Sequence, residues 1–162
     1  MQVSLEELLE SRDLRVRHQQ ELQAAFPEST LICLTVQLPG AVKRSSHSLI
    51  VGGAGMTALL EKFGSVLSHA QVRDLETGYE AYLAVKLPAA LVKRLCVSIE
   101  EDHPLGRLMD IDVMGCDRAS LGIAPRRCLL CDNEARYCMR ARAHTREALM
   151  EKIDRMIGDY IR

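Results

Sequence analysis

The stretch EEDHPLGRLMDIDV, residues 100–113, contains the pattern on which the predicted fold depends. Its second half alternates between apolar residues and two aspartates, Asp110 and Asp112. Because successive side chains of a β-strand point to opposite faces, the apolar set is expected on one face and both aspartates on the other. The sequence therefore predicts a strand at residues 107–114 with one buried face and one acidic face.

The two aspartates could bind a divalent cation. Residues two apart in a strand have Cα atoms about 6.6 Å apart, and carboxylate oxygens suit Mg²⁺. The alternative is an edge strand with a solvated acidic face. The residues before the strand favour a site, because Gly106 allows a close approach of backbone or ligand and Arg107 can bind a phosphate bidentately.

The composition is ordinary for a soluble globular protein. The 162 residues are 48% hydrophobic and 27% charged, with a net charge of -1, and they are predicted to form one domain, residues 1–162. The low net charge argues against non-specific nucleic-acid binding, and no uninterrupted apolar run reaches the ~18 residues of a membrane span. Six cysteines without a signal peptide indicate reduced thiols and a cytoplasmic location.

Hydrophobic periodicity and turn residues predict four helices and four strands. The expected helices are residues 4–25, 54–63, 88–101 and 145–161, and the expected strands are residues 31–36, 72–75, 81–86 and 107–114. These elements indicate an α+β fold, a single domain whose central mixed or antiparallel sheet is covered by helices. The strand with the two aspartates is also analogous to the palm of nucleotidyltransferase folds.

Three segments could contact phosphate. In the first helix, long polar residues that include Arg12 share a stripe with apolar ones, so the stripe either enters a phosphate-lined cleft or lies flat with arginine stems over apolar surface. Lys43 begins a basic loop that is either solvated surface or a triphosphate contact. Residues 52–55 are rich in glycine and precede a predicted helix; such a segment can bind phosphate, but a flexible helix start is the default interpretation.

Arginine is concentrated in residues 115–146, directly after the acidic strand. The segment contains seven arginines and only three acidic residues. Arginine is well suited to bidentate phosphate contacts, so a cation site beside this segment would fit a polyphosphate substrate. The alternative is a solvated basic face.

The same segment contains three cysteines and a histidine that could bind zinc, namely Cys128, Cys131, Cys138 and His144. Three thiolates and an imidazole can form a tetrahedral site. The alternative is a set of separate buried thiols or a structural cluster without metal. The tight spacing after the first cysteine pair favours this alternative over zinc.

Several separated stretches, in order, resemble the citrate lyase holo-[acyl-carrier-protein] synthase family, the phosphoribosyl-dephospho-coenzyme A transferases. They are RDLRVRHQQ at 12–20, LPGAVK at 38–43, EDHPLGRLMDIDV at 101–113, Arg118 with Leu121-Gly122, RRCLLC at 126–131, and Ala135, Cys138 and His144. The resemblance covers nearly the whole chain. Met109 stands where the family usually has an aromatic residue.

The resemblance implies an enzyme that attaches a prosthetic group. The donor would be triphosphoribosyl-dephospho-coenzyme A, the acceptor a serine of the apo acyl-carrier subunit of citrate lyase, and the leaving group pyrophosphate. Asp110 and Asp112 would then hold Mg²⁺ on the triphosphate. The phosphate-binding candidates are Arg107, Arg126 and Arg127, followed by Lys43 and Arg12.

His103 is the candidate for deprotonating or orienting the acceptor serine, because the ordinary pKa of histidine lies near neutral pH. Its alternative role is that of a turn residue bonded to the backbone. Two other functions also remain open. One is a Cys3His zinc module that binds a protein partner without catalysis, and the other is a nucleotidyltransferase that acts on RNA or a small molecule.

Overall fold

The computed structural model describes residues 1–162 and contains one four-stranded antiparallel sheet. Its strands are β1 (Thr30–Val36), β2 (Leu67–Leu75), β3 (Gly78–Val85) and β4 (Met109–Val113). They lie in the order β2-β3-β1-β4, so β4 forms one edge of the sheet. The predicted α+β class is confirmed, and the sheet is antiparallel.

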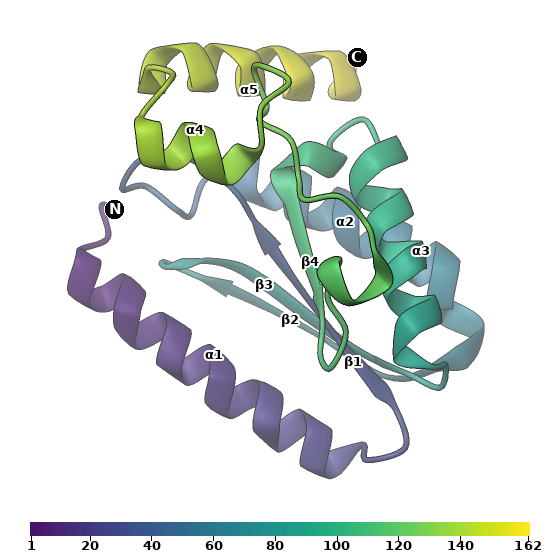
Figure 1. Cartoon of the computed structure of the whole chain (residues 1–162). Helices are drawn as coiled ribbons and strands as arrows, with labels where there is room; N and C mark the ends of the chain where they lie inside the picture. Colours follow the sequence, from purple (N-terminus) through teal and green to yellow (C-terminus); the bar gives the residue numbers. More distant parts are fainter.

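Five α-helices surround the sheet: α1 (Leu5–Ala25), α2 (Ser46–Phe63), α3 (Ala89–Asp102), α4 (Ala135–Ala141) and α5 (Arg146–Ile161). Figure 1 shows α1, in purple, on one side of the sheet and α2 and α3 on the other, with α4 and α5 together at one end. Each face of the sheet is therefore covered differently, and the two faces have different chemistry.

The main hydrophobic core lies between the sheet and the helices α2, α3 and α5. Met109, Ile111 and Val113 of β4 are buried in this core, whereas Asp110 is half-buried and Asp112 is exposed. The alternation predicted from the sequence is therefore present, and it turns both aspartates toward the face that α1 covers.

Helix α2 begins at Ser46 rather than near residue 54, and Ser45 caps it. The glycine-rich residues 52–55 consequently lie inside the helix, and the interpretation of these residues as a helix start is wrong. A Cβ atom on Gly52 would lie 2.5 Å from the ring of Tyr79, and one on Gly55 would lie 2.8 Å from a methyl group of Leu34. The glycines thus allow close packing of α2 onto the sheet.

Residues 46–66, which comprise α2 and the turn after it, are long and apolar enough to cross a membrane by length and composition alone. Glycines and polar residues interrupt this segment, so it does not contain the uninterrupted apolar run by which a membrane span was judged from the sequence. Val51, Leu59 and Phe63 are fully buried in the main core. Packing in the core accounts for these three apolar residues, whereas Leu49 and Leu60 of the same helix are exposed.

The face of the sheet beneath α1 is mostly polar. Leu22 of α1 packs in a small apolar cluster with Cys33 and Tyr82. Elsewhere α1 contacts the sheet through polar groups, including the ion pair of Arg15 with Glu80 at 3.3 Å. Arg15 of the mixed stripe therefore has a specific carboxylate partner on the sheet.

Two buried side chains of α3 cover the outer edge of β4. Lys93 Nζ donates to the Ile111 carbonyl at 2.9 Å, and the Ile111 N–H donates to Glu100 Oε2 at 3.0 Å. Lys93 and Glu100 are two helical turns apart and therefore share one face of α3. Their contacts satisfy the backbone of an edge strand and fix α3 against β4.

The remaining differences from the predicted elements concern polar segments. Strands β2 and β3 begin at Leu67 and Gly78 rather than at 72 and 81, because hairpin pairing extends beyond the apolar pattern. Gln71 pairs with Tyr82 in the added part of β2, and Tyr79 pairs with Asp74 in the added part of β3. Helix α4 was not predicted; it has seven residues and no capping side chain. A 3₁₀ turn, Gly106–Leu108, precedes β4, and the other boundaries agree within two residues.

Candidate active site

The aspartate pair occupies the face of β4 that points away from the main core. Asp110 has a protein partner, because its Oδ2 accepts a hydrogen bond of 3.0 Å from the side-chain amide of Gln37, at the end of β1. Asp112 is exposed and has no side-chain hydrogen bond to lower its pKa. One carboxylate is therefore held in place and the other is free to bind a ligand.

The surroundings of Asp112 disfavour its negative charge. Partial desolvation by the protein, and then the neighbouring Asp110 carboxylate, raises the pKa of Asp112 to about 6, against weaker opposing contributions from Lys93 and Arg15. Water nevertheless reaches the side chain. Two adjacent carboxylates whose repulsion is only partly balanced favour a cation between them, and their oxygens suit a hard divalent ion.

Buried Glu100 holds two arginines beside the pair. Arg118 Nη2 lies 2.9 Å from Glu100 Oε1, and Arg126 Nη1 lies 3.7 Å from Oε2. Arg126 also lies 3.8 Å from Asp110 Oδ1 and donates to the Arg107 carbonyl at 2.9 Å. Arg126 therefore lies at the predicted site, but much of its hydrogen-bonding capacity is used by the protein.

Arg107 and Arg127 complete this first cationic group. Burial, and then the positive charges of Arg126, Arg118 and Arg127, lower the pKa of Arg107. Arg127 is 68% exposed, and its one ion pair is a 4.0 Å contact with the fully exposed Asp132. Mutually repelling cations attract an anion, and Arg127 is the member of the group most free to contact it.

A second cationic group surrounds the loop after β1. Lys43 Nζ donates to the Leu38 carbonyl at 2.8 Å, and burial, followed by the charges of Arg12 and Arg146, lowers the pKa of Lys43. Leu38 directly follows Gln37, whose amide holds Asp110. The candidates Lys43 and Arg12 are thus brought together beside this loop. Arg146 joins them, although the sequence analysis had not included it among the site residues.

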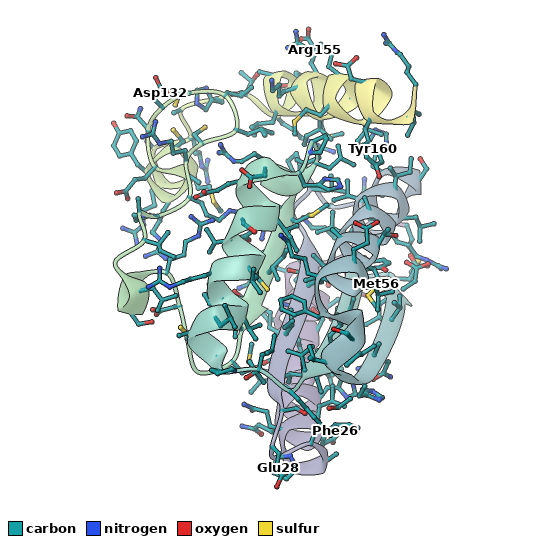
Figure 2. The ribbon with its side chains drawn as sticks, turned by 90° about the vertical axis from the view of Figure 1, so that its right-hand side faces the viewer. Phe26, Glu28, Met56, Asp132, Arg155 and Tyr160 are labelled. Carbon is teal, nitrogen blue, oxygen red and sulfur yellow. The ribbon has the colours of Figure 1, made fainter.

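His103 contacts the backbone of its own turn and the last helix. Its Nδ1 accepts a hydrogen bond of 3.0 Å from the Leu105 N–H, and its ring packs on Tyr160 of α5 at 5.6 Å between centroids. Figure 2 shows Tyr160 at the end of the molecule formed by α5, opposite Phe26. Both contacts fit the alternative role considered for His103, that of a turn residue bonded to the backbone.

The four metal-ligand candidates are brought together. Cys128, Cys131, Cys138 and His144 each place one ligand atom within 4.8 Å of the others, so they form a cluster that could bind a metal ion. The expectation of separate buried thiols is therefore wrong. The spacing looked too tight because α4, which brings Cys138 back toward Cys131, was not predicted.

Several residues near the site were missed by the sequence analysis. Glu100 and Lys93 had a signal, namely charged residues seven apart on an otherwise apolar helix face. Gln37 had none, since its role depends on the pairing of β1 with β4. Between α1 and the β2–β3 hairpin lies a cavity of about 280 Å³ that is lined by Arg15 and Glu80 and by neither aspartate.

A known protein family matches nearly the whole chain. Residues 3–160 match the model of the family described as apo-citrate lyase phosphoribosyl-dephospho-CoA transferase. The chain belongs to this family. It is therefore an enzyme of the nucleotidyltransferase type that acts as a transferase on apo-citrate lyase, and the resemblance noted in the sequence is confirmed.

Curated relatives of the family align with nearly the whole chain. A protein of Vibrio cholerae (strain M66-2) named "probable apo-citrate lyase phosphoribosyl-dephospho-CoA transferase" is 40% identical over 99% of this chain and 94% of its own length. A protein of Streptococcus pyogenes serotype M18 with the same name is 32% identical over 98% of this chain and 87% of its own length. The transferase family therefore extends over the aspartate pair, both cationic groups and the Cys3His cluster.

Proposed function

We propose that the protein transfers the phosphoribosyl-dephospho-coenzyme A group from triphosphoribosyl-dephospho-coenzyme A to a serine of the acyl-carrier subunit of apo-citrate lyase. The serine oxygen forms a bond to the phosphorus attached to the ribose, and the hydroxyl proton is released to water. The bond between that phosphorus and pyrophosphate breaks. The products are a phosphodiester on the carrier and free pyrophosphate.

The observation that carries this proposal is the position of the aspartate pair among cations. Transfer of this kind depends on positioning and on neutralising phosphate charge rather than on covalent chemistry by the protein. Asp112 is exposed and free of partners, and Arg107 and Lys43 belong to two clusters of cations whose charges repel one another. A polyphosphate with a divalent cation would relieve both kinds of repulsion.

We assign Asp110 and Asp112 as the residues that would hold Mg²⁺, which when bound would neutralise the triphosphate. Arg127 would bind phosphate oxygens directly, because its guanidinium is the most exposed of the first group. Arg107 and Arg126 would keep that side of the site positive, and Arg126 would also orient Asp110. Lys43 and Arg12 would contact phosphate from the second group.

His103 is left out of the proposed machinery, because its Nδ1 is bonded to the backbone and its ring packs on α5. We place the reaction in the cytoplasm. All six cysteines are free thiols in the structure, and a reducing compartment would keep them so.

The test is intact-protein mass spectrometry of the apo acyl-carrier subunit after incubation with this protein, the donor and Mg²⁺. The expected result is a mass increase equal to the prosthetic group, with one pyrophosphate released per carrier modified. A carrier with its acceptor serine replaced by alanine serves as the control and should not change in mass.

A parallel reaction with ATP in place of the donor tests the other candidate function. Nucleotide incorporation into RNA or a small molecule, without carrier modification, would favour a nucleotidyltransferase with a different acceptor. A folded protein that changes neither the carrier nor any other acceptor would overturn the proposed transfer.

A further inference from the structure

We propose that Cys128, Cys131, Cys138 and His144 bind one Zn²⁺ ion, which organises residues 126–145 and thereby holds Arg126 and Arg127 at the site. The four ligand atoms lie within 4.8 Å of one another, and the sulfur atoms of Cys131 and Cys138 are 3.5 Å apart. With Zn–S bonds of about 2.3 Å, a tetrahedral site has ligand atoms roughly 3.8 Å apart. The side chains are therefore close to the geometry that zinc requires.

The backbone around the first cysteine pair prepares it for a metal. The Leu130 N–H donates to Cys128 Sγ at 3.4 Å, a hydrogen bond that favours the thiolate form of the sulfur. The turn is closed by Cys128 N–H to the Asn133 carbonyl at 2.7 Å and by Ala135 N–H to the Arg126 carbonyl at 2.8 Å. Asp132, at the outer tip of this turn, points into solvent (Figure 2).

The fourth ligand has an unpartnered polar atom. Nε2 of His144 is buried and has no hydrogen-bond partner in the protein, an arrangement that is costly for a polar group. Coordination of a metal by the imidazole would give such a group a partner. The histidine is brought to the cysteines by the end of α4, where Arg142 adopts a left-handed conformation and the Ala143 N–H bonds back to the Cys138 carbonyl at 3.1 Å.

Residues 115–145 have almost no hydrophobic core of their own. Cys128 and Cys138 are the two buried residues of this segment, and its regular structure is a 3₁₀ turn and the seven-residue α4. A segment that buries so little surface needs another source of stability. Metal coordination supplies it in small loop-rich structures, where binding of the ion and folding are coupled.

The charge of the segment also fits a metal centre. Zinc with three thiolates and a neutral imidazole carries one net negative charge, and zinc binding releases the protons of the three thiols. Residues 115–145 contain six arginines and three acidic residues, so the surrounding charge is of the opposite sign. Because Arg126 and Arg127 directly precede Cys128, the metal would fix their backbone, from which the Arg126 side chain reaches Asp110 and Glu100.

The first test is the zinc content of the full chain purified from zinc-replete cells, measured by plasma mass spectrometry. We expect one zinc per chain. Replacement by Co²⁺ should give visible bands of a tetrahedral ion and charge-transfer bands of cobalt–thiolate bonds. A wild-type chain that neither holds zinc nor gives these cobalt bands would overturn the proposal. An intact mass about 2 Da lower, with peptide mapping that assigns a disulfide to Cys131 and Cys138, would also overturn it.

The second test uses matched cysteine variants. Cys138→Ser removes a ligand and should weaken zinc binding by more than the ~10–100-fold that substitutions outside the ligand set cost. Cys116→Ser is the control, because this thiol lies in the same segment, outside the cluster, near Ser120. Equal zinc content in both variants would overturn the assignment. If Cys138→Ser does not fold, the wild-type cobalt spectrum and the control variant still decide the question, independently of the transfer assay.

Discussion

The carboxylate of Glu100 lies directly behind the aspartate pair: its Oε2 accepts a hydrogen bond of 3.0 Å from the N–H of Ile111, the residue between Asp110 and Asp112. Its other oxygen accepts a hydrogen bond of 2.9 Å from Arg118. One buried side chain therefore connects α3, the edge strand and the arginine-rich segment, so the position of the pair depends on the packing of α3.

Glu100→Gln is expected to lower the free energy of unfolding by about 1.5–3 kcal/mol, the usual loss when a hydrogen bond to a buried charged group is removed. The amide can still accept from Ile111, but the charge that holds Arg118 is gone. Urea unfolding measures the change. Glu101→Gln is the control, because Glu101 is 58% exposed and pairs with Arg118 at 3.5 Å; its effect should stay within ~0.5 kcal/mol. Equal losses in both variants would contradict this role of Glu100.

Two adjacent glycines in α2 should respond oppositely to substitution by alanine. Gly52→Ala places a methyl group 2.5 Å from the Tyr79 ring and is expected to destabilise the fold by about 1–3 kcal/mol through overpacking. Gly53 has open space at its Cβ position, so Gly53→Ala should stabilise the protein by up to ~1 kcal/mol through helix propensity. Thermal unfolding of both variants checks the prediction. A stabilised Gly52→Ala variant would contradict the prediction, because it would show that α2 can move away from Tyr79 without loss of stability.

The helices and strands that have a clear apolar periodicity or a capping residue could be predicted from the sequence. The strand with Asp110 and Asp112, the capped first helix and the last helix follow from local patterns, and each lies where the sequence placed it. The start of α2 could not be predicted in this way, because glycine is a poor helix former and the reason for Gly52 and Gly55 is their contact with Tyr79 and Leu34.

Candidate site residues could be selected from the sequence where their chemistry is local, but not where pairing of strands brings them together. The aspartate pair, Arg107 and the arginines at 126 and 127 are marked by the sequence alone. The bond from Gln37 to Asp110 depends on the register of β1 against β4. His103 was selected for the ordinary pKa of its side chain, and only the structure shows that the Leu105 N–H occupies its Nδ1.

Arg127→Ala is expected to weaken donor binding without a loss of stability. Its guanidinium is 68% exposed, and loss of one charge-assisted phosphate contact should cost ~1.5–3 kcal/mol, or roughly tenfold to a hundredfold in affinity. Calorimetric titration with the donor measures the effect. Arg136→Ala is the matched control, an exposed arginine of the same segment, and should bind the donor normally. A similar loss of donor affinity in both variants would contradict a specific contact by Arg127 and would attribute donor binding to the overall positive charge of the segment.

Arg126→Ala is expected to weaken donor binding and to lower stability, whereas Arg127→Ala should weaken donor binding alone. Arg126 contacts Glu100, Asp110 and the Arg107 carbonyl, so its removal leaves buried groups with fewer partners and lowers stability as well as donor affinity. Urea unfolding and donor titration on the same sample separate the two effects. Unchanged donor binding with lower stability would assign Arg126 to a structural role alone.

The effect of Mg²⁺ on thermal stability should depend on pH. The pKa of Asp112 is raised to about 6, so the side chain is protonated below that pH and a proton competes with the metal. Apparent Mg²⁺ affinity should fall up to tenfold for each pH unit below the pKa, and the Mg²⁺-induced rise in melting temperature should shrink in step. A rise of equal size at about pH 5 and pH 7.5 would contradict metal binding by Asp112.

In the absence of Mg²⁺, the raised pKa of Asp112 should make the protein slightly more stable at low pH than at neutral pH. Because the pKa of Asp112 is higher in the fold than its ordinary value of 3.8, its contribution to stability is present below about pH 4 and is lost as the pH rises through about 6. Water screens this exposed side chain, so the change should be below ~1 kcal/mol. Asp112→Asn should remove it, as unfolding across this pH range would show.

The most direct test of the central claim is the rate at which Asp110→Asn and Asp112→Asn variants modify the acyl-carrier serine in the presence of Mg²⁺. Each substitution removes a negative charge on the open face of β4 and leaves its buried apolar face unchanged. Because positioning and electrostatics supply most of the catalysis in phosphoryl transfer, turnover should fall by ~10² or more, while thermal unfolding shows an intact fold. A folded double variant that modifies the carrier at close to the wild-type rate would contradict the account and place the catalytic centre elsewhere.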